Sequence, residues 1–321
     1  MQLQPAFGSN PKIERLYVER ETFQRAHAAR TTLRGYAHDW KHFAAWCDEM
    51  QRCALPATPD TLSLYITDLL LRRKKVTTAA RIVCGVAYTH RQNGAASPVT
   101  TEVRNILWGA RRLRLELPRQ MKPLTLAQVR EIAAALESDG TPRTIRDRAL
   151  VVLGFASALR RSNLAALLLG EIEFCAEGLR IRVRREKQDP AGLRRRIIGV
   201  PYGQDLTFCP VGCLHAWLNI RGTESGPLFT RLDPARDHDL QGLSLNGIAR
   251  VVKAAVARIG LDPTLYGPHS LRAGFITEAG QHNVGPLVIA AQTGHRSLDS
   301  LQRYFRPVDA FRVNACAALG L

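Results

Sequence analysis

Six residues in the second half of the chain have side chains whose types and spacing suit chemistry on a phosphodiester. They are Arg160, Lys187, His269, Arg272, His295 and Tyr304. A planar guanidinium can hold a phosphate through two parallel hydrogen bonds, so Arg160 and Arg272 predict a phosphate clamp. Lysine and histidine can supply protons and hydrogen bonds, and a tyrosine hydroxyl can attack phosphorus. This chemistry requires neither a metal ion nor a cofactor, and we predict none.

The order and spacing of these residues resemble the tyrosine recombinases of the phage integrase family, in particular the Cre-like and Xer-like site-specific recombinases. The motifs that carry the resemblance are Ala-Leu-Arg160-Arg-Ser, His269-Ser-Leu-Arg272, and Thr-Gly-His295-Arg-Ser with Tyr304 nine residues after the histidine. A His-x-x-Arg pair alone occurs by chance in many proteins, whereas the complete ordered set is specific. The resemblance covers nearly the whole chain.

The resemblance implies that Tyr304 is a nucleophile that attacks the scissile phosphate. The attack would form a 3′-phosphotyrosyl enzyme and free a 5′-hydroxyl. Arg160 and Arg272 would hold the non-bridging oxygens and stabilise the charge that develops on them. Because the covalent bond conserves the energy of the broken strand, rejoining would need neither ATP nor a divalent metal.

The resemblance also assigns roles to the other basic residues. Lys187 would protonate the departing 5′-oxygen, His269 would accept or position the tyrosine proton, and His295 would hydrogen-bond the phosphate. Lys187 is the only lysine in an arginine-rich hairpin, and arginine is a poor proton donor because its pKa is too high. One position departs from the family: Asn163 stands where a carboxylate is common, and a carboxylate would orient basic neighbours better than an amide.

The composition predicts a two-domain protein that binds nucleic acid. The chain has 321 residues, and its 45 lysines and arginines against 28 acidic residues give a formal net charge of +17. Such an excess can neutralise several DNA phosphates and release their counterions, so binding should weaken steeply with salt. A membrane surface, or no ligand at all, is the alternative. No apolar run suits a signal peptide or a membrane span, so we expect a cytoplasmic protein. It would be associated with the nucleoid if it comes from a bacterium or a phage.

The periodicity predicts a mainly helical fold with a small antiparallel sheet. Residues 1–25 are polar and weakly patterned, which predicts a flexible arm. Residues 26–115 are helical, the two prolines in residues 116–123 indicate a linker, and residues 124–321 form a second domain. The resemblance implies a helical core-binding (SAM-like) domain followed by an α+β catalytic domain of the tyrosine-recombinase type.

Four helices are predicted in the first domain. An apolar stripe runs through residues 31–47, Pro59 begins a second helix, Thr77 or Thr78 caps a third, and residues 101–115 form a fourth. The first and third resemble the helices with which the family's core-binding domain enters the major groove. We therefore expect DNA contacts from Thr32, Arg34, His38, Lys41, Lys75, Thr77, Thr78 and Arg81. Arginine and threonine can read base edges, whereas lysines bind phosphates.

The second domain combines helices with one hairpin. Residues 125–128 form a capping box, residues 144–168 are mostly helical, and the alternating residues 179–183 and 196–200 predict a β-hairpin with Lys187 at its tip. Further helices are expected after Ser244, Pro268, Pro286 and Ser297.

The cysteines predict neither a disulfide framework nor a metal site. Seven of them are scattered along the chain, which indicates reduced thiols. Cys209, Cys213 and His215 are close in sequence but lack a second pair of ligands at a suitable spacing. Pro210 instead fits the first turn of a helix.

Three functions are compatible with these residues. The first is a site-specific recombinase that acts on double-stranded DNA with inverted half-sites, as a dimer on each site and a homo-tetramer on two sites. The second is a DNA-binding regulator that does not cut, and the third is a strand-relaxing enzyme similar to type IB topoisomerases. The complete residue set disfavours the second function. The DNA-clamping first domain and the apolar C-terminal tail disfavour the third.

The 17 residues after Tyr304 carry apolar side chains that no later strand or helix covers. From this pattern and the resemblance we predict that the tail docks on a neighbouring protomer, and packing on its own domain is the alternative. Truncation after Pro307 should then spare binding to a single DNA site but abolish the pairing of two sites, which gel-shift assays would show. Normal recombination by the truncated protein would refute the contact between protomers.

Overall fold

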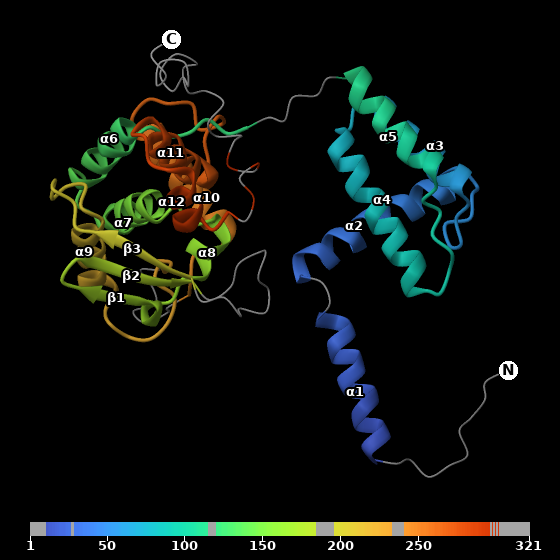
Figure 1. The fold of residues 1–321 in the computed structure, drawn as a ribbon, viewed down its shortest axis with the longest axis horizontal. Coiled ribbons are helices and arrows are strands. Elements are labelled where there is room, and N and C mark those ends of the chain that lie inside the picture. The colour runs from blue at the N-terminus through green and yellow to red at the C-terminus, as the bar shows by residue number, and fades with distance from the viewer. Residues whose placement is uncertain are drawn as a thin grey trace. The chain divides into compact units, whose positions relative to one another are not determined.

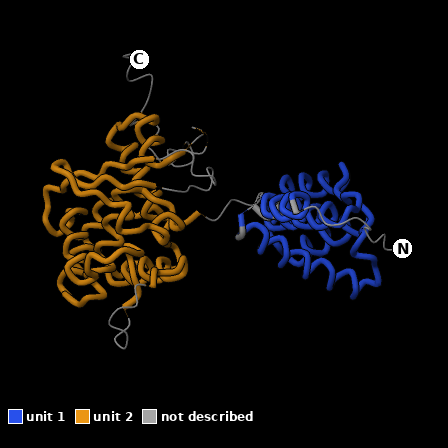
Figure 2. The backbone as a smooth tube through the Cα atoms, turned by 90° about the horizontal axis from the view of Figure 1, so that it is seen from below, with its two compact units in different colours: residues 1–119 blue, residues 120–321 orange. Residues whose placement is uncertain are grey.

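The structure is a computed structural model, and it divides into two compact units, residues 1–119 (unit 1) and 120–321 (unit 2) (Figure 2). It describes residues 11–26, 29–114, 120–183, 196–232, 241–295, 297, 299 and 301. Both units are mainly helical, and a small antiparallel sheet lies in unit 2 (Figure 1), which confirms the predicted fold class. None of the helices in these ranges is long and apolar enough to cross a membrane. The domain limits drawn from the sequence stay predictions.

Unit 1 consists of helices, and all but the first of them contribute to one apolar core. Its helices are α1 (Pro11–Ala26), α2 (Arg30–Glu49), α3 (Pro59–Leu71), α4 (Val76–Gln92) and α5 (Thr101–Arg114). Phe43, Leu62, Ile66 and Val86 are fully buried in the core that α2, α3 and α4 share. The Thr58 hydroxyl caps α3 by accepting a hydrogen bond from the Thr61 amide, so Pro59 begins this helix as predicted.

Helix α4 begins earlier than the sequence indicated. The predicted cap at Thr77 or Thr78 is wrong, because Lys75 is the N-cap and both threonines lie in the first turn. The chain leaves α3 through a tight turn in which the Lys74 amide donates to the Leu69 carbonyl (3.0 Å). Burial of Val76 in the core then starts α4 without a side-chain cap.

Residues 11–25, which belong to the stretch predicted to be a flexible arm, lie in helix α1. Its large apolar side chains do not join the core, since Ile13, Leu16, Tyr17, Val18 and Phe23 are all exposed. This lack of an inward-facing stripe explains why periodicity did not predict the helix. Residues 1–10 lie outside the described residues.

Unit 2 packs its helices around the longest buried element, α7 (Pro142–Ser157). The others are α6 (Leu126–Glu137), α8 (Arg161–Ala166), α9 (Pro210–Arg221), α10 (Leu245–Arg258), α11 (Pro268–Gln281), α12 (Pro286–Thr293) and the 3-10 turn η1 (Leu169–Glu171). The predicted capping box is confirmed: the Gln128 amide donates to the Thr125 hydroxyl, and the Thr125 amide donates to the Gln128 side chain. The predicted cap at Ser244 is confirmed as well.

The sheet has the order β1-β2-β3, with β1 (Ile172–Cys175), β2 (Gly178–Val183) and β3 (Arg196–Pro201) all antiparallel. The predicted hairpin is confirmed, with Ile181 paired to Ile198. Leu179, Ile181 and Val183 are buried, and the residues between them are exposed, which gives the alternation seen in the sequence. Strand β1 was not predicted, because this short edge strand has no buried side chain.

Gly274 lets α11 approach the chain segment that leads into α6. The Leu124 amide donates to the Ser270 carbonyl (3.0 Å), and a Cβ at Gly274 would overlap the Leu124 carbonyl oxygen. Leu124 is itself fully buried. Because α11 also carries His269 and Arg272, this contact helps to fix the helix on which the site depends.

Replacement of Gly274 by alanine should lower the free energy of unfolding of unit 2 by about 1–3 kcal/mol, which is the usual cost of overpacking. Gly109, in the interior of α5, is the matched control, because nothing lies within 4 Å of the position that its Cβ would take. Gly109→Ala should raise the free energy of unfolding of unit 1 by about 0.5–1 kcal/mol through helix propensity. Urea unfolding followed by circular dichroism measures both, and equal effects would contradict the close approach at Gly274.

Candidate active site

Arg160 lies at a sharp break between two helices. Helix α7 ends at Ser157, and Ala158 adopts the left-handed conformation (φ 48°), so the chain reverses before α8 begins at Arg161. Arg160 is thereby the N-cap of α8, with a half-buried side chain whose Nη2 donates to the Gly294 carbonyl (3.3 Å). The break holds this guanidinium beside the end of α12.

Arg272 is buried in unit 2 and is bound to the same break. Its side chain on α11 is 1% exposed, and its Nη1 donates to the Ala158 carbonyl at 2.7 Å. A buried guanidinium needs hydrogen-bond acceptors, and the reversal at Ala158 supplies one. Each arginine of the predicted clamp is therefore bound by a backbone carbonyl, Arg160 by that of Gly294 and Arg272 by that of Ala158.

His295 completes this cluster from the end of α12. Gly294 takes the left-handed conformation that ends the helix (φ 68°), and the His295 amide donates to the Ala290 carbonyl. The Arg272 Nη2 lies 3.2 Å from Nε2 and 3.4 Å from Nδ1 of the imidazole. Burial of the ring, together with the charges of Arg272 and Arg160, lowers the pKa of His295 to about 4. The ring is therefore neutral at neutral pH.

His269 lies one helical turn before Arg272 on α11. Part of its ring faces solvent, but the loss of hydration on its packed side lowers its pKa, and the charges of Arg272 and Arg160 lower it further. Both histidines are therefore proton acceptors beside two fixed cations. A bound anion would shift both pKa values upward, because opposite charge favours the protonated ring.

The structure thus brings together four of the six residues predicted for catalysis, namely Arg160, His269, Arg272 and His295. Lys187 and Tyr304 lie outside the described residues. The roles assigned to all six stay predictions.

Sequence reasoning missed Arg196 and Thr293, which also adjoin the site. Arg196 begins β3, donates to the Gln292 carbonyl at the end of α12, and contributes to the low pKa of His295. Thr293, the last residue of α12, contacts the His295 ring through its hydroxyl (2.7 Å). The arginine-rich hairpin was visible in the sequence, but its alignment with α12 depends on tertiary packing.

Asn163, at the position where the family commonly has a carboxylate, lies in α8 with a half-buried side chain. Its backbone amide donates to the Arg160 carbonyl at 2.9 Å, which belongs to the first turn of this short helix.

The residues predicted to contact DNA lie on α2 and at the start of α4, two helices that pack together in unit 1. All are exposed except Thr78, which is half-buried. Arg34, His38 and Lys41 form one stripe along α2 at helical spacing. Arg81 is about half exposed and forms an ion pair with the buried carboxylate of Asp39, so α2 orients this guanidinium on α4.

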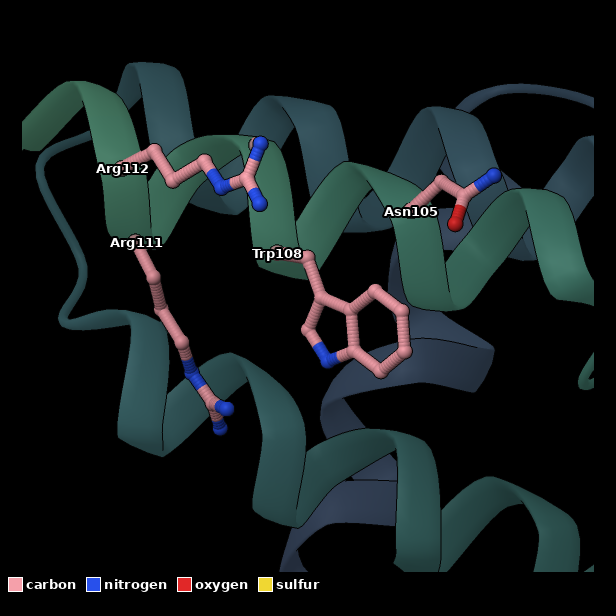
Figure 3. A pocket seen from close by; sticks show the side chains of 5 residues that line it. Asn105, Trp108, Arg111 and Arg112 are labelled. Carbon is pink, nitrogen blue, oxygen red and sulfur yellow. The ribbon is translucent and has the colours of Figure 1, made fainter.

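Helix α5 adds an aromatic and cationic surface to unit 1. Asn105, Trp108, Gly109, Arg111 and Arg112 line an open hollow of about 460 Å³. Figure 3 shows the indole of Trp108 between the two arginines on one side and Asn105 on the other. Trp108 is 61% exposed, so its flat face and the neighbouring charges are accessible to an anionic ligand with rings.

The cysteine cluster serves packing. The Cys209 sulfur accepts a hydrogen bond from the Gly203 amide, the Cys213 thiol donates to the Thr207 carbonyl, and the ring of His215 packs against Phe174. Within the described ranges, no three histidine, cysteine, aspartate or glutamate side chains are grouped so that they could hold a metal ion.

Comparison with known proteins shows to which family the chain belongs. The sequence profile of the Phage integrase family matches residues 122–310, more than half of the chain. The integrase/recombinase xerD homolog of Selenomonas ruminantium is 32% identical over 311 residues, which cover 94% of this chain and 89% of that protein. The chain belongs to the phage integrase family. It is a tyrosine recombinase of the Xer-like type, an enzyme that transfers DNA strands.

One further relative and two solved structures are also similar to this chain. The tyrosine recombinase XerD of Xanthomonas axonopodis pv. citri is 30% identical over 199 residues, which span 59% of this chain and 59% of that relative. The Tn1549 transposon integrase in complex with transposon right end DNA shares the fold, with a TM-score of 0.65 at 13% identity over 94% of this chain and 98% of that chain. A lambda integrase dimer bound to a COC′ core site has a TM-score of 0.59 at 16% identity over 95% and 83%.

Replacement of Arg160 or Arg272 by lysine should slow strand cleavage by this recombinase about 100- to 1,000-fold, the usual effect of losing one donor to a developing negative charge. An ammonium keeps the charge but cannot bind two oxygens in the plane of a fork. The assay is covalent attachment to a nicked duplex that the protein has selected from random DNA. Arg161→Lys, at an exposed position next to Arg160, is the control and should keep the wild-type rate. Wild-type cleavage by Arg160→Lys would remove that residue from the clamp.

Proposed function

We propose that this protein is a site-specific recombinase that cuts and rejoins DNA through a 3′-phosphotyrosyl intermediate at Tyr304. The observation that carries the proposal is the cluster of Arg160 and Arg272 with two neutral histidines at one chain reversal, in a member of the phage integrase family. Two guanidinium groups beside two neutral histidines form a cradle that a phosphodiester would neutralise.

The proposed cleavage reaction follows from the charges of the two arginines and the neutral histidines in this cradle. Arg160 and Arg272 bind the non-bridging oxygens and stabilise the charge that grows on them as the tyrosine oxygen attacks. His269 is neutral before attack and accepts or positions the tyrosine proton. Lys187 donates a proton to the departing 5′-oxygen, so cleavage creates one ester and one hydroxyl. Rejoining reverses both proton transfers and needs no external energy source.

Unit 1 supplies most of the sequence-specific binding in this proposal. Helices α2 and α4 enter the major groove, and their predicted contacts are Thr32, Arg34, His38, Lys41, Lys75, Thr77, Thr78 and Arg81. Asp39 fixes the Arg81 guanidinium, and a fixed guanidinium can read a base edge with less loss of entropy than a mobile one. The arginines beside Trp108 on α5 extend the cationic surface.

The assembly is a homo-tetramer that pairs two sites, each bound by a dimer on inverted half-sites, and strand exchange passes through a Holliday junction. A lambda integrase tetramer bound to a Holliday junction shares the fold, with a TM-score of 0.60. The C-terminal tail after Tyr304 links neighbouring protomers. If the chain comes from a bacterium or a phage, the recombinase acts in the cytoplasm at the nucleoid.

Tyr304→Phe should bind the selected duplex with wild-type affinity and form no covalent adduct, because it lacks the attacking oxygen. Denaturing gel electrophoresis after incubation with nicked duplex separates adduct from free protein, and gel shifts measure binding.

Tyr202→Phe removes a hydroxyl from an exposed tyrosine of unit 2 and is the matched control, so it should form the adduct normally. An adduct formed by Tyr304→Phe would exclude this residue as the nucleophile. A wild-type protein that binds the duplex without ever forming an adduct would favour a regulator that does not cut.

A further inference from the structure

Thr293 is a buried residue whose hydroxyl lies between the backbone of α12 and the His295 ring. Its side chain is fully buried, and its Oγ1 lies 2.6 Å from the Ile289 carbonyl oxygen and 2.7 Å from Nδ1 of His295. Both distances are those of strong hydrogen bonds. Each hydrogen bond needs one proton between its two heavy atoms. Counting the available protons therefore shows which nitrogen of the His295 ring is protonated.

The threonine hydroxyl has a single proton. The Ile289 carbonyl can only accept, so the hydroxyl proton lies in that bond. The hydroxyl oxygen must then accept in its contact with His295, and the proton of that contact belongs to Nδ1. The remaining nitrogen, Nε2, carries a lone pair when the ring is neutral.

The charges around the ring favour this neutral state. Arg272 has donors only, and its Nη2 lies 3.2 Å from Nε2 and 3.4 Å from Nδ1, so the extra proton of an imidazolium would be repelled by a neighbouring cation. Arg272 and Arg160 are cations, His269 is neutral at neutral pH, and Arg196 on β3 adds a third positive charge. The ring nitrogen that can gain or lose a proton is then Nε2.

We propose that Thr293 is a positioning residue that holds His295 in the Nδ1-protonated tautomer, so that Nε2 alone exchanges protons with the phosphate cradle. The inference rests on the proposed function, because it assigns His295 to the phosphate. A bound phosphodiester supplies the negative charge that favours protonation of Nε2 by a proton taken up from water. The resulting Nε2–H then donates to a non-bridging oxygen, while Thr293 continues to hold Nδ1–H.

A buried threonine near the end of a helix often bonds to the carbonyl four residues earlier without any functional role. A structural role and a positioning role for Thr293 predict different results. A purely structural Thr293 would leave the tautomer of His295 unaffected, whereas a positioning residue determines it. Thr293→Val removes the hydroxyl at nearly constant shape, and Thr293→Ser retains it.

The first measurement is ¹⁵N NMR of histidine-labelled, full-length protein without DNA at neutral pH, with the His295→Gln variant used to assign the signals. Wild-type protein and Thr293→Ser should show a protonated Nδ1 and an unprotonated Nε2 at His295. Thr293→Val should shift the ring toward the Nε2-protonated tautomer. An Nε2-protonated ring in wild-type protein would overturn the proposal, and so would an Nδ1-protonated ring that persists in Thr293→Val. The wild-type spectrum decides even if the valine variant does not fold.

The second measurement is the rate of covalent adduct formation on the selected nicked duplex. Thr293→Val should slow this step about 10- to 100-fold, the usual effect of removing a group that orients a functional histidine, with unchanged DNA affinity. Thr293→Ser should recover most of the rate. A wild-type rate for Thr293→Val, or a loss that serine does not rescue, would refute the positioning role. If wild-type protein forms no adduct, the proposed function is wrong. The NMR measurement still tests the tautomer of His295, because it does not depend on adduct formation.

Discussion

The buried guanidinium of Arg272 is the constraint on which the rest of the site depends. Burial of a cation is costly unless hydrogen-bond acceptors replace the lost water. The buried Arg272 donates to the Ala158 carbonyl at 2.7 Å. That hydrogen bond requires α11 to lie against the chain reversal that follows α7. Arg160 lies in the same reversal. Gly274 allows α11 to lie close enough to the backbone at Leu124 for this meeting. The stability of the fold and the proposed binding of phosphate therefore depend on the same few contacts.

Much of this arrangement could be read from the sequence because its determinants are local. The capping box at Thr125, the cap at Ser244 and the alternating strands of the β2–β3 hairpin are each specified within a few residues, and all are present. The residues proposed to carry chemistry were visible because their types and order are unusual. None of this required knowledge of how distant segments pack.

The parts that escaped prediction depend on tertiary contacts. The start of α4 is set by burial of Val76 rather than by a capping side chain, so the nearby threonines misled the sequence reasoning. Helix α1 has no apolar stripe that faces the core, and periodicity therefore gave no signal. Arg196 and Thr293 lie beside the site only because β3 packs against the end of α12. A single sequence does not encode that alignment in any local pattern.

The end of α12 explains how a cluster of cations can be stable before DNA binds. The last carbonyls of a helix lack partners within the helix and carry partial negative charge. Gly294 accepts from Arg160 and Gln292 accepts from Arg196, so the helix end offsets part of the repulsion between these guanidinium groups. A carbonyl is a weaker acceptor for a guanidinium than a phosphate oxygen, which carries a full charge. Each arginine has five N–H donors and can therefore bind phosphate while the helix end continues to orient it. In the proposed clamp, neutral carbonyl groups orient Arg160 and Arg196 before a ligand brings its negative charge.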